Sequence, residues 1–532
     1  MQDIILKNGR ICDGTGAPAY VGDVWIKDGK ITRVGLPVEE PCAQEVDCTG
    51  LAIAPGFVDI HSHSDTVFLI DGKCEGKLYQ GVTSELSGQC GSTIYPCAAD
   101  RMENLRAYVG NSKQYDTAYY TSSSLGEFVS KLGEKQVRIS VNQLPLIGHG
   151  ALRAGVMGFE GRKAAPEELK LMCSLMEEQM QDGAWGMSLG LGYAPGIFAD
   201  QEELNALGEV VARYDGLITS HMRNQGEHIY DALEEMYEIN RKTGARVHIA
   251  HLKMSYKKHW GTAWKVAQHL QNARDEGVSV TADMYPYRAS SSGITNILPK
   301  WSLDGGIPMA AKRLEAGGEE ADKMMAALQE YFQTEEDGEG VFIVSTHGSY
   351  PPANGKTILD LSREWNLSMA DAARELILKT KGNASCIFFS MADEDVNYLL
   401  ARNEIAIGSD GSCYPLSEEA NEGKLHPRNF GTFPRFLRLC RENQWCDLAT
   451  AVHRITGKSA GIIGLTDRGL LKEGLVADIT VFDPEGITDK ATYQDPFQKP
   501  EGICHVIMNG QFALKDGSQT ENRLGSIILK NK

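Results

Sequence analysis

Long apolar runs are missing from this sequence. No stretch approaches the roughly 18 consecutive apolar residues that a membrane-spanning helix needs. The opening residues, MQDIILKNGR, lack the basic and then apolar segments of a signal peptide, so we expect none. CxxC pairs are also missing among the twelve cysteines, whose irregular spacing is typical of free thiols in a reducing compartment. We therefore expect a soluble, cytoplasmic protein without a membrane partner.

Positive charge is scarce as well. The chain has 53 basic and 71 acidic residues, which give a formal net charge of -18. Such a surface repels phosphates, and this argues against nucleic acid as a partner. An anionic substrate would need basic residues gathered at its own site. The sequence leaves the oligomeric state open.

The two ends of the chain predict β-structure. Residues 1–54 and 470–532 read as short strands broken by turns, for example GDVWIKDGKITRVG and GICHVIMNGQFALKDG. Because the termini of a domain tend to lie close together, we expect both segments to form one small composite β-sandwich.

The middle of the chain, residues 55–469, alternates between apolar runs and amphipathic helical stretches. GLITSHM, ARVHIAHLK and EIAIGSDG are examples of the apolar runs. This alternation predicts parallel strands covered by helices, and its length favours a TIM-like (β/α)8 barrel over an open doubly wound sheet. No GxGxxG loop supports the open sheet. The stretch at about 288–345 breaks the rhythm, and we expect an insertion or lid there.

Metal-ligand residue types recur where the apolar runs end. They are His61, His63, Cys90, His221, His251 and Asp410. The carboxyl ends of parallel barrel strands face the active site, so these side chains should converge. His61 and His63 lie two residues apart on one strand and point to the same side. Imidazoles, a thiolate and a carboxylate are zinc ligands, and six exceed what one tetrahedral ion needs. We infer two adjacent sites that share a ligand.

Several stretches, taken together, resemble the amidohydrolase superfamily and, more narrowly, its N-acyl-D-amino-acid deacylases (D-aminoacylases). They include GFVDIHSHSD, GVTSELSGQCG, GMSLGLGYAPG, IAHLK, YPY, GSDGS and HPRNFGTFPR. They span nearly the whole chain in the family's order. The resemblance implies zinc-dependent hydrolysis of a small-molecule substrate, an N-acyl-D-amino acid, to a carboxylate and a free D-amino acid.

The resemblance also implies how the ligands divide. Family members carry a cysteine in a GNCG-like loop where many superfamily members have a carboxylated lysine, and Cys90 stands here in GQCG. Cys90, His221 and His251 would hold the tighter zinc. A weaker second site, whose occupancy is left open, would consist of His61, His63 and Asp410, with Cys90 as the candidate bridge.

Catalysis and substrate binding need further groups. Asp410 is the predicted general base, which then returns the proton to the leaving amine. Lys253 lies two residues beyond His251, on the same side of the strand, and is predicted to bind the substrate's α-carboxylate. The remaining candidates for substrate contacts are Tyr193 and Tyr287, which the resemblance adds, and Arg223 and Arg288, which could face an anionic group.

Two other interpretations of the sequence stay open. One is a cyclic-amide hydrolase of the dihydroorotase or hydantoinase kind, or a dipeptidase acting on a D-residue. The other is a non-catalytic binding protein that kept the fold. The Cys90 loop favours the deacylase, and the presence of all six ligand candidates favours an enzyme.

Overall fold

A computed structural model describes residues 1–110, 112–335 and 340–530. Within this part of the chain, eight parallel strands follow one another around a closed circuit. In order they are β6 (Phe57–Asp59), β7 (Val82–Ser87), β8 (Asn142–Pro145) continued by β9 (Ile147–Gly148), β10 (Gly186–Gly190), β11 (Leu217–His221), β12 (Arg246–Ile249), β13 (Val280–Met284) and β17 (Ala406–Ile407). A parallel bridge between Ser62 and Gly411 joins the last strand to the first. The predicted (β/α)8 barrel is confirmed.

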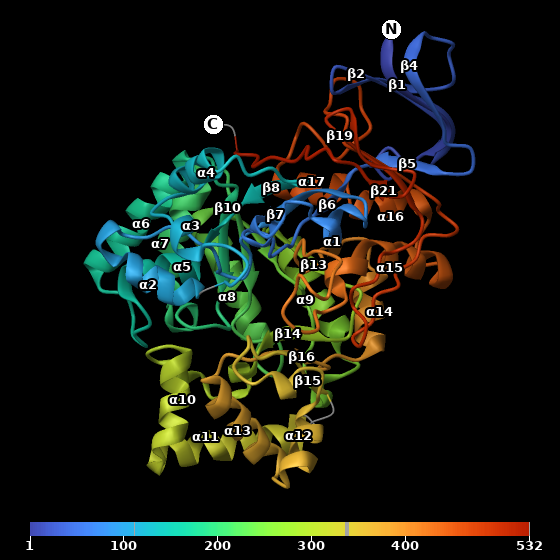
Figure 1. The fold of residues 1–532 in the computed structure, drawn as a ribbon. Helices are drawn as coiled ribbons and strands as arrows, with labels where there is room; N and C mark the ends of the chain where they lie inside the picture. The colour runs from blue at the N-terminus through green and yellow to red at the C-terminus, as the bar shows by residue number, and fades with distance from the viewer. Residues whose placement is uncertain (111, 336–339, 531–532) are drawn as a thin grey trace.

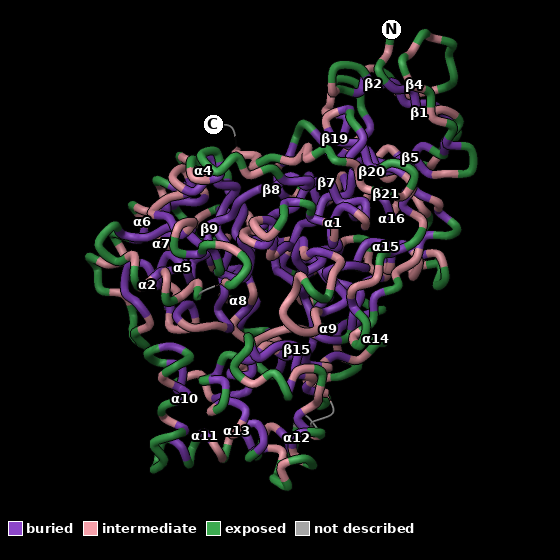
Figure 2. The backbone as a smooth tube through the Cα atoms, viewed as in Figure 1, coloured by how far each residue is buried: buried purple, intermediate pink, exposed green. Residues whose placement is uncertain are grey.

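Helices cover the outside of the barrel. They are α1 (Glu75–Leu78), α2 (Met102–Val109), α3 (Thr117–Tyr120), α4 (Leu125–Glu134), α5 (His149–Met157), α6 (Pro166–Gln181), α7 (Gln201–Arg213), α8 (Ile229–Thr243), α9 (Ala263–Asp275), α14 (Asp393–Leu400), α15 (Arg428–Asn443), α16 (Leu448–Arg454) and α17 (Gly457–Ile463). Helix α6 illustrates how the sequence determines where such a helix begins and which face it buries. Proline stands at its first position, and Met172, Met176 and Met180 bury one face at a spacing of four residues. Buried segments accordingly concentrate inside the ring of helices (Figure 2).

Strands from both chain ends join in one nine-stranded sheet. From the start of the chain come β1 (Gln2–Ile11), β2 (Tyr20–Lys27), β3 (Lys30–Gly35), β4 (Cys42–Asp47) and β5 (Ala52–Pro55), and from its end β18 (Ile479–Phe482), β19 (Ile503–Met508), β20 (Gln511–Lys515) and β21 (Ser518–Gln519). The two sets meet where β5 pairs with β1 on one side and with β18 on the other.

The last described residues leave this sheet, although the sequence assigns 470–532 to the β-sandwich. Ile527 forms a parallel bridge with Gln143 of barrel strand β8. The indole N–H of Trp185 donates to the carbonyl of Ile528 at 2.7 Å. The end of the chain therefore packs along the barrel, because its backbone supplies hydrogen-bond partners to barrel residues.

A smaller unit projects from the barrel on the side away from β1–β4 (Figure 1). It contains β14 (Ser290–Gly293), β15 (Val341–Ser345), β16 (Ser385–Phe388), α10 (Ile307–Ala316), α11 (Gly318–Glu330), α12 (Ile358–Trp365) and α13 (Met369–Thr380). Its own apolar core runs from Ile294 to Phe388. The unit thus extends beyond the insertion expected at about 288–345. The sequence hides this extension because α12, α13 and β16 repeat the helix and strand alternation of the barrel.

Among the described residues, we find no helix that combines the length and the apolar character needed to cross a bilayer.

A buried ion-pair network ties the first barrel strand to the last. Lys77 Nζ donates to Asp59 Oδ2 at 2.5 Å and to Ser409 Oγ at 2.6 Å, and lies 3.3 Å from Glu85 Oε2. Asp59 Oδ1 accepts from the backbone N–H groups of Ser409, at 2.9 Å, and of His61, at 3.1 Å. The three charged side chains have no solvent exposure. One lysine therefore forms ion pairs with two carboxylates at the point where the barrel closes.

We predict that Lys77→Met destabilises the protein by about 3–5 kcal/mol, since it leaves two carboxylates buried without a counter-ion. The free energy of unfolding in urea measures this. The control is Lys323→Met, which removes an exposed lysine 2.7 Å from Glu319 and should change stability by less than about 0.5 kcal/mol. Equal effects of the two substitutions would contradict the role given to Lys77.

Candidate metal centre

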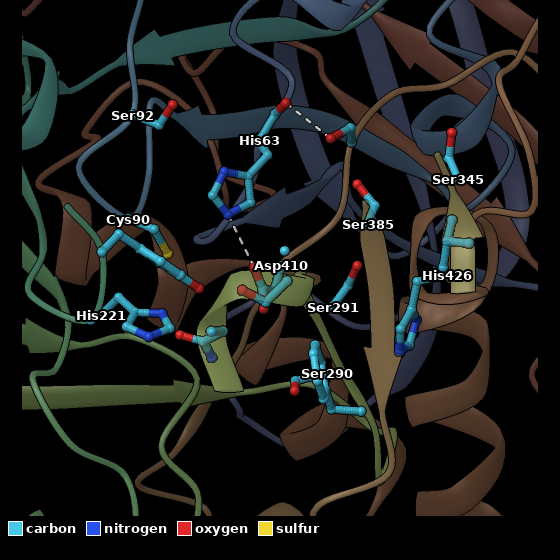
Figure 3. Close-up of a pocket in the computed structure, with 18 of the residues that line it drawn as sticks. His63, Cys90, Ser92, His221, Ser290, Ser291, Ser345, Ser385, Asp410 and His426 are labelled. Carbon is cyan, nitrogen blue, oxygen red and sulfur yellow. Dashed lines mark hydrogen bonds and ion pairs between the residues drawn. The ribbon is translucent and has the colours of Figure 1, made fainter. Parts of the chain in front are cut away.

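The six predicted ligands meet at the carboxyl ends of the barrel strands. Figure 3 shows His63, Cys90, His221 and Asp410 facing one another. Their donor atoms, with those of His61 and His251, form two groups in which all atoms lie within 4.8 Å of one another. One group is Cys90, His221 and His251, and the other is His61, His63, Cys90 and Asp410.

Cys90 belongs to both groups. Its Sγ lies 3.5 Å from His61 Nε2 and 3.6 Å from His251 Nε2. Around it, His221 Nδ1 is 2.9 Å from His251 Nε2, and His63 Nε2 is 3.1 Å from Asp410 Oδ1. The thiol is thus the donor that the two groups have in common.

The backbone at three of these ligands is left-handed. Cys90, His251 and Asp410 have φ values of +54°, +38° and +50°. Each residue follows a barrel strand, so the turn redirects its side chain from the strand toward the mouth of the barrel. For residues other than glycine this conformation costs of order 1–3 kcal/mol, and such residues cluster at functional sites. The fold therefore loses some stability in order to direct these three donors toward the site.

The protonation states suit a metal. Burial opposes ionisation of the Cys90 thiol, but His61, with hydrogen bonds from His221 and His251, holds its pKa well below the usual range. Burial lowers the pKa of His221, and burial with nearby Lys253 lowers that of His251 to about 3. A thiolate and two neutral imidazoles are the donor forms that bind a divalent metal ion. The residues present therefore fit a metal centre.

Asp283 is a functional residue that the sequence reasoning missed. Its Oδ2 lies 3.3 Å from His61 Nδ1 and accepts from His248 Nε2 at 2.8 Å, and its Oδ1 accepts from the backbone N–H of His251 at 2.9 Å. It is fully buried, yet His61 and His248 hold its pKa below the usual range. A carboxylate on the outer ring nitrogen turns the other nitrogen, Nε2, toward the metal. Its position near the end of strand β13 could have identified it from the sequence.

A cavity of about 1060 Å³ opens from the ligands toward the smaller unit. Lys253 and Arg428 line it, and Lys253 Nζ and Arg428 Cζ each lie 5.2 Å from the centroid of the Tyr285 ring. Lys253 Nζ is 3.3 Å from the Tyr285 hydroxyl, and Arg428 Nη1 donates to Asp410 Oδ2 at 2.7 Å. Burial opposes ionisation of Asp410, but Arg428 outweighs it and holds the pKa of the carboxyl well below the usual range. Arg428 belongs to the stretch HPRNFGTFPR, but the sequence of that stretch did not indicate its contact with Asp410.

Tyr287 and Arg288, predicted as substrate contacts, lie outside this cavity. The backbone N–H of Tyr287 donates to the carbonyl of Tyr285 at 2.9 Å, so the chain turns at Pro286 and strand alternation ends there. The Tyr285 ring centroid lies 6.4 Å from that of the ligand His251, while Tyr287 and Arg288 line a separate pocket of about 210 Å³. A substrate contact at Tyr287 or Arg288 stays a prediction.

Tyr193 and Arg223 both line the large cavity. The Tyr193 ring centroid lies 4.5 Å from that of His221. Arg223 donates to Glu235 at 2.7 Å and to the carbonyls of Ile197 and Ala199. Its guanidinium thus holds neighbouring loops together rather than offering free donors to an anion.

The barrel, the shared thiol and the strand-end carboxylate together define a metal-dependent hydrolase. Residues 44–341 and 416–513 match the amidohydrolase family. N-acyl-D-glutamate deacylase of Alcaligenes xylosoxydans xylosoxydans is 30% identical over 99% of this chain and 97% of its own length.

Two solved structures superpose over essentially the full length of both chains. One is N-acyl-D-glutamate deacylase of Bordetella bronchiseptica, complexed with zinc and a phosphonate that mimics the tetrahedral intermediate (28% identity, 99% of each chain, TM-score 0.82). The other is D-aminoacylase, studied for its binuclear metal centre (28% identity, 100% of each chain, TM-score 0.83). The chain belongs to the amidohydrolase family, in its group of N-acyl-D-amino-acid deacylases.

We predict that Asp283→Ala lowers metal affinity by about tenfold to a hundredfold, because His61 loses the carboxylate that orients it. Competition with a chelating indicator measures this. Asp395→Ala is the matched control: it removes a buried carboxylate that accepts from the backbone of Gly261 and Ala263 and should leave metal affinity unchanged. Unchanged affinity in Asp283→Ala would contradict the orienting role.

Proposed function

We propose that this protein is a zinc-dependent N-acyl-D-amino-acid deacylase, which hydrolyses a linear amide to a carboxylate and a free D-amino acid. One observation carries the proposal. Two groups of donor atoms share Cys90 at the mouth of the barrel, in a chain that is similar to such deacylases over its full length. The thiol favours zinc over magnesium or calcium, which prefer oxygen ligands.

We assign the tighter zinc to Cys90, His221 and His251. A second, weaker ion would add His61, His63 and Asp410 while sharing the thiol. When bound, zinc supplies Lewis acidity toward the amide carbonyl and acidifies water.

Asp410 is the proposed general base and acid. Its carboxylate lies at the donor cluster, 3.1 Å from His63 Nε2, and Arg428 keeps it ionised and therefore able to accept a proton. A carboxylate oxygen would take the proton from the attacking water and pass it to the amine nitrogen as the amide bond breaks. Without this transfer the amine would leave as a poor, unprotonated group.

The substrate's α-carboxylate is proposed to bind at Lys253. Lys253 is 4% exposed, and its Nζ lies 3.3 Å from the Tyr285 hydroxyl. Arg428, also next to the Tyr285 ring, adds positive charge, and Tyr193 lines the same cavity. A buried ammonium group is well placed to pair with a carboxylate.

The cytoplasm is the proposed location. All twelve cysteines of the chain are free thiols in the structure, and free thiols are maintained in a reducing compartment.

A panel of N-acetyl D- and L-amino acids tests the proposal. We expect hydrolysis of D-substrates, loss of activity after removal of metal with a chelator, and recovery when zinc is added back. Exclusive hydrolysis of L-substrates would overturn the substrate assignment, and full activity without metal would overturn the metal assignment.

Asp410→Asn should lower kcat by about a hundredfold to ten-thousandfold, because the amide cannot accept the proton. Asparagine also tolerates the left-handed backbone at this position, so the variant should stay folded. Metal analysis of the same preparation should still find the ion held by Cys90, His221 and His251. Turnover equal to the unmodified enzyme would sink the assignment of Asp410.

A further inference from the structure

Two cysteine side chains meet where helix α15 ends. Cys440 lies in the last turn of α15, and Cys446 stands in the short connection that leads to the neighbouring helix α16 (Figure 1). The left-handed backbone of Gln444 turns the chain between them. The Sγ atoms of the two cysteines are 3.9 Å apart. A disulfide bond is ~2.05 Å long, so the two sulfur atoms need to approach by only about 2 Å to be joined.

The two thiols differ in their access to solvent. Cys440 is 2% exposed, whereas Cys446 is half-buried. Asn443, Gln444 and Asp447, which flank Cys446 in the sequence, are exposed. A small solute therefore reaches Cys446 before it reaches Cys440.

A buried arginine supplies positive charge to the pair. Arg454, the last residue of α16, has no solvent exposure. Its Nε donates to the carbonyl of Ile405 at 3.0 Å, and its Nη1 donates to that of Leu400 at 2.6 Å. Among the residues that the structure describes, its Nη2 has no hydrogen-bond partner. A buried guanidinium with an unused donor favours an anion nearby, and a thiolate at Cys446 is such an anion.

The surroundings favour ionisation of one thiol of the pair. A hydrogen bond with Cys440, together with the charge of Arg454, outweighs burial and lowers the pKa of the Cys446 thiol to about 7. The same hydrogen bond and burial raise the pKa of Cys440. By contrast, burial raises the pKa of Cys12 to about 12. The thiolate is the reactive form of cysteine, so Cys446 is the attacking thiol and Cys440 keeps its proton.

This pair of thiols is separate from the metal centre. Helix α15 begins at Arg428, which contacts Asp410, and Cys440 follows a little over three turns later. At ~5.4 Å per turn, the helix places Cys440 roughly 18 Å from Arg428. Chemistry at the two thiols therefore involves neither the metal nor the substrate, and it does not depend on the proposed deacylase function.

We propose that Cys440 and Cys446 are a site of reversible disulfide formation by oxidants of the peroxide class. The Cys446 thiolate attacks one oxygen of hydrogen peroxide, the O–O bond breaks, and a sulfenic acid forms on Cys446. The hydroxide that leaves takes up the proton that Cys446 released when it ionised. The Cys440 sulfur then attacks the Cys446 sulfur, so that the S–S bond forms and the S–O bond breaks. The second hydroxide leaves with the Cys440 proton as water. The two thiols together lose two electrons, and the peroxide is reduced to two molecules of water.

Mass spectrometry of the full-length, metal-loaded protein tests the proposal, since a bound metal keeps the Cys90 thiolate occupied. After treatment with hydrogen peroxide and blocking of free thiols, trypsin cuts after Arg441, between the two cysteines. We expect a disulfide that joins the peptide ending at Arg441 to the peptide ending at Arg454, and its loss after reduction with dithiothreitol. Two thiols that stay reduced, that pair only with other cysteines or that form only sulfinic and sulfonic acids would overturn the inference.

Single substitutions separate the roles of the two thiols. In peroxide with dimedone, which traps sulfenic acids, Cys440→Ser should accumulate the adduct at Cys446, because the thiol that resolves the sulfenic acid is missing. Cys446→Ser should form at least about tenfold less adduct at Cys440, whose thiolate fraction and exposure are lower. Equal trapping in the two variants would overturn the assignment of Cys446 as the attacking thiol.

The matched control is Cys173→Ser, which removes another half-buried thiol, in helix α6. It should leave the yield of the disulfide between Cys440 and Cys446 unchanged. Loss of that disulfide in the control would show that the two cysteines do not suffice as the site, and the inference would be overturned. Should Cys440→Ser not fold, Cys440→Ala decides by the same trapping at Cys446.

Discussion

Closure of the barrel is the constraint on which the site depends, and a buried lysine secures it. Lys77 lies between Asp59 and Glu85, and Asp59 in turn holds the backbone of His61 and Ser409. Those two contacts directly follow the first and last strands and so hold the backbone at His61 and next to Asp410. A charge buried away from solvent thus supports the backbone that carries two of the metal-ligand candidates.

The barrel and the smaller unit make different contributions to the cavity. Strand ends of the barrel supply the metal donors. The left-handed backbone at three of these residues directs their side chains, and tightly packed neighbours hold that backbone in place. The serines of β14 come from a unit with its own apolar core. The cavity is therefore lined by two separately packed parts of the chain.

The sequence predicted the barrel and its donors because both are local signals: an apolar run, then a ligand-type residue. Contacts that depend on a turn or on packing gave no such signal. Tyr285 and Tyr287 are the same residue type in the sequence, which gives no sign that the chain turns at Pro286 and that Tyr287 lines a separate pocket.

The composite sheet imposes an order of events during synthesis. Strand β5 leads directly into the first barrel strand, but its outer edge pairs with β18, which begins at Ile479. While the ribosome makes the intervening four hundred or so residues, that edge has no partner, and an open strand edge can pair with other chains. The nascent protein therefore depends on completing translation, or on a chaperone, to protect the edge that its own C-terminal segment will cover.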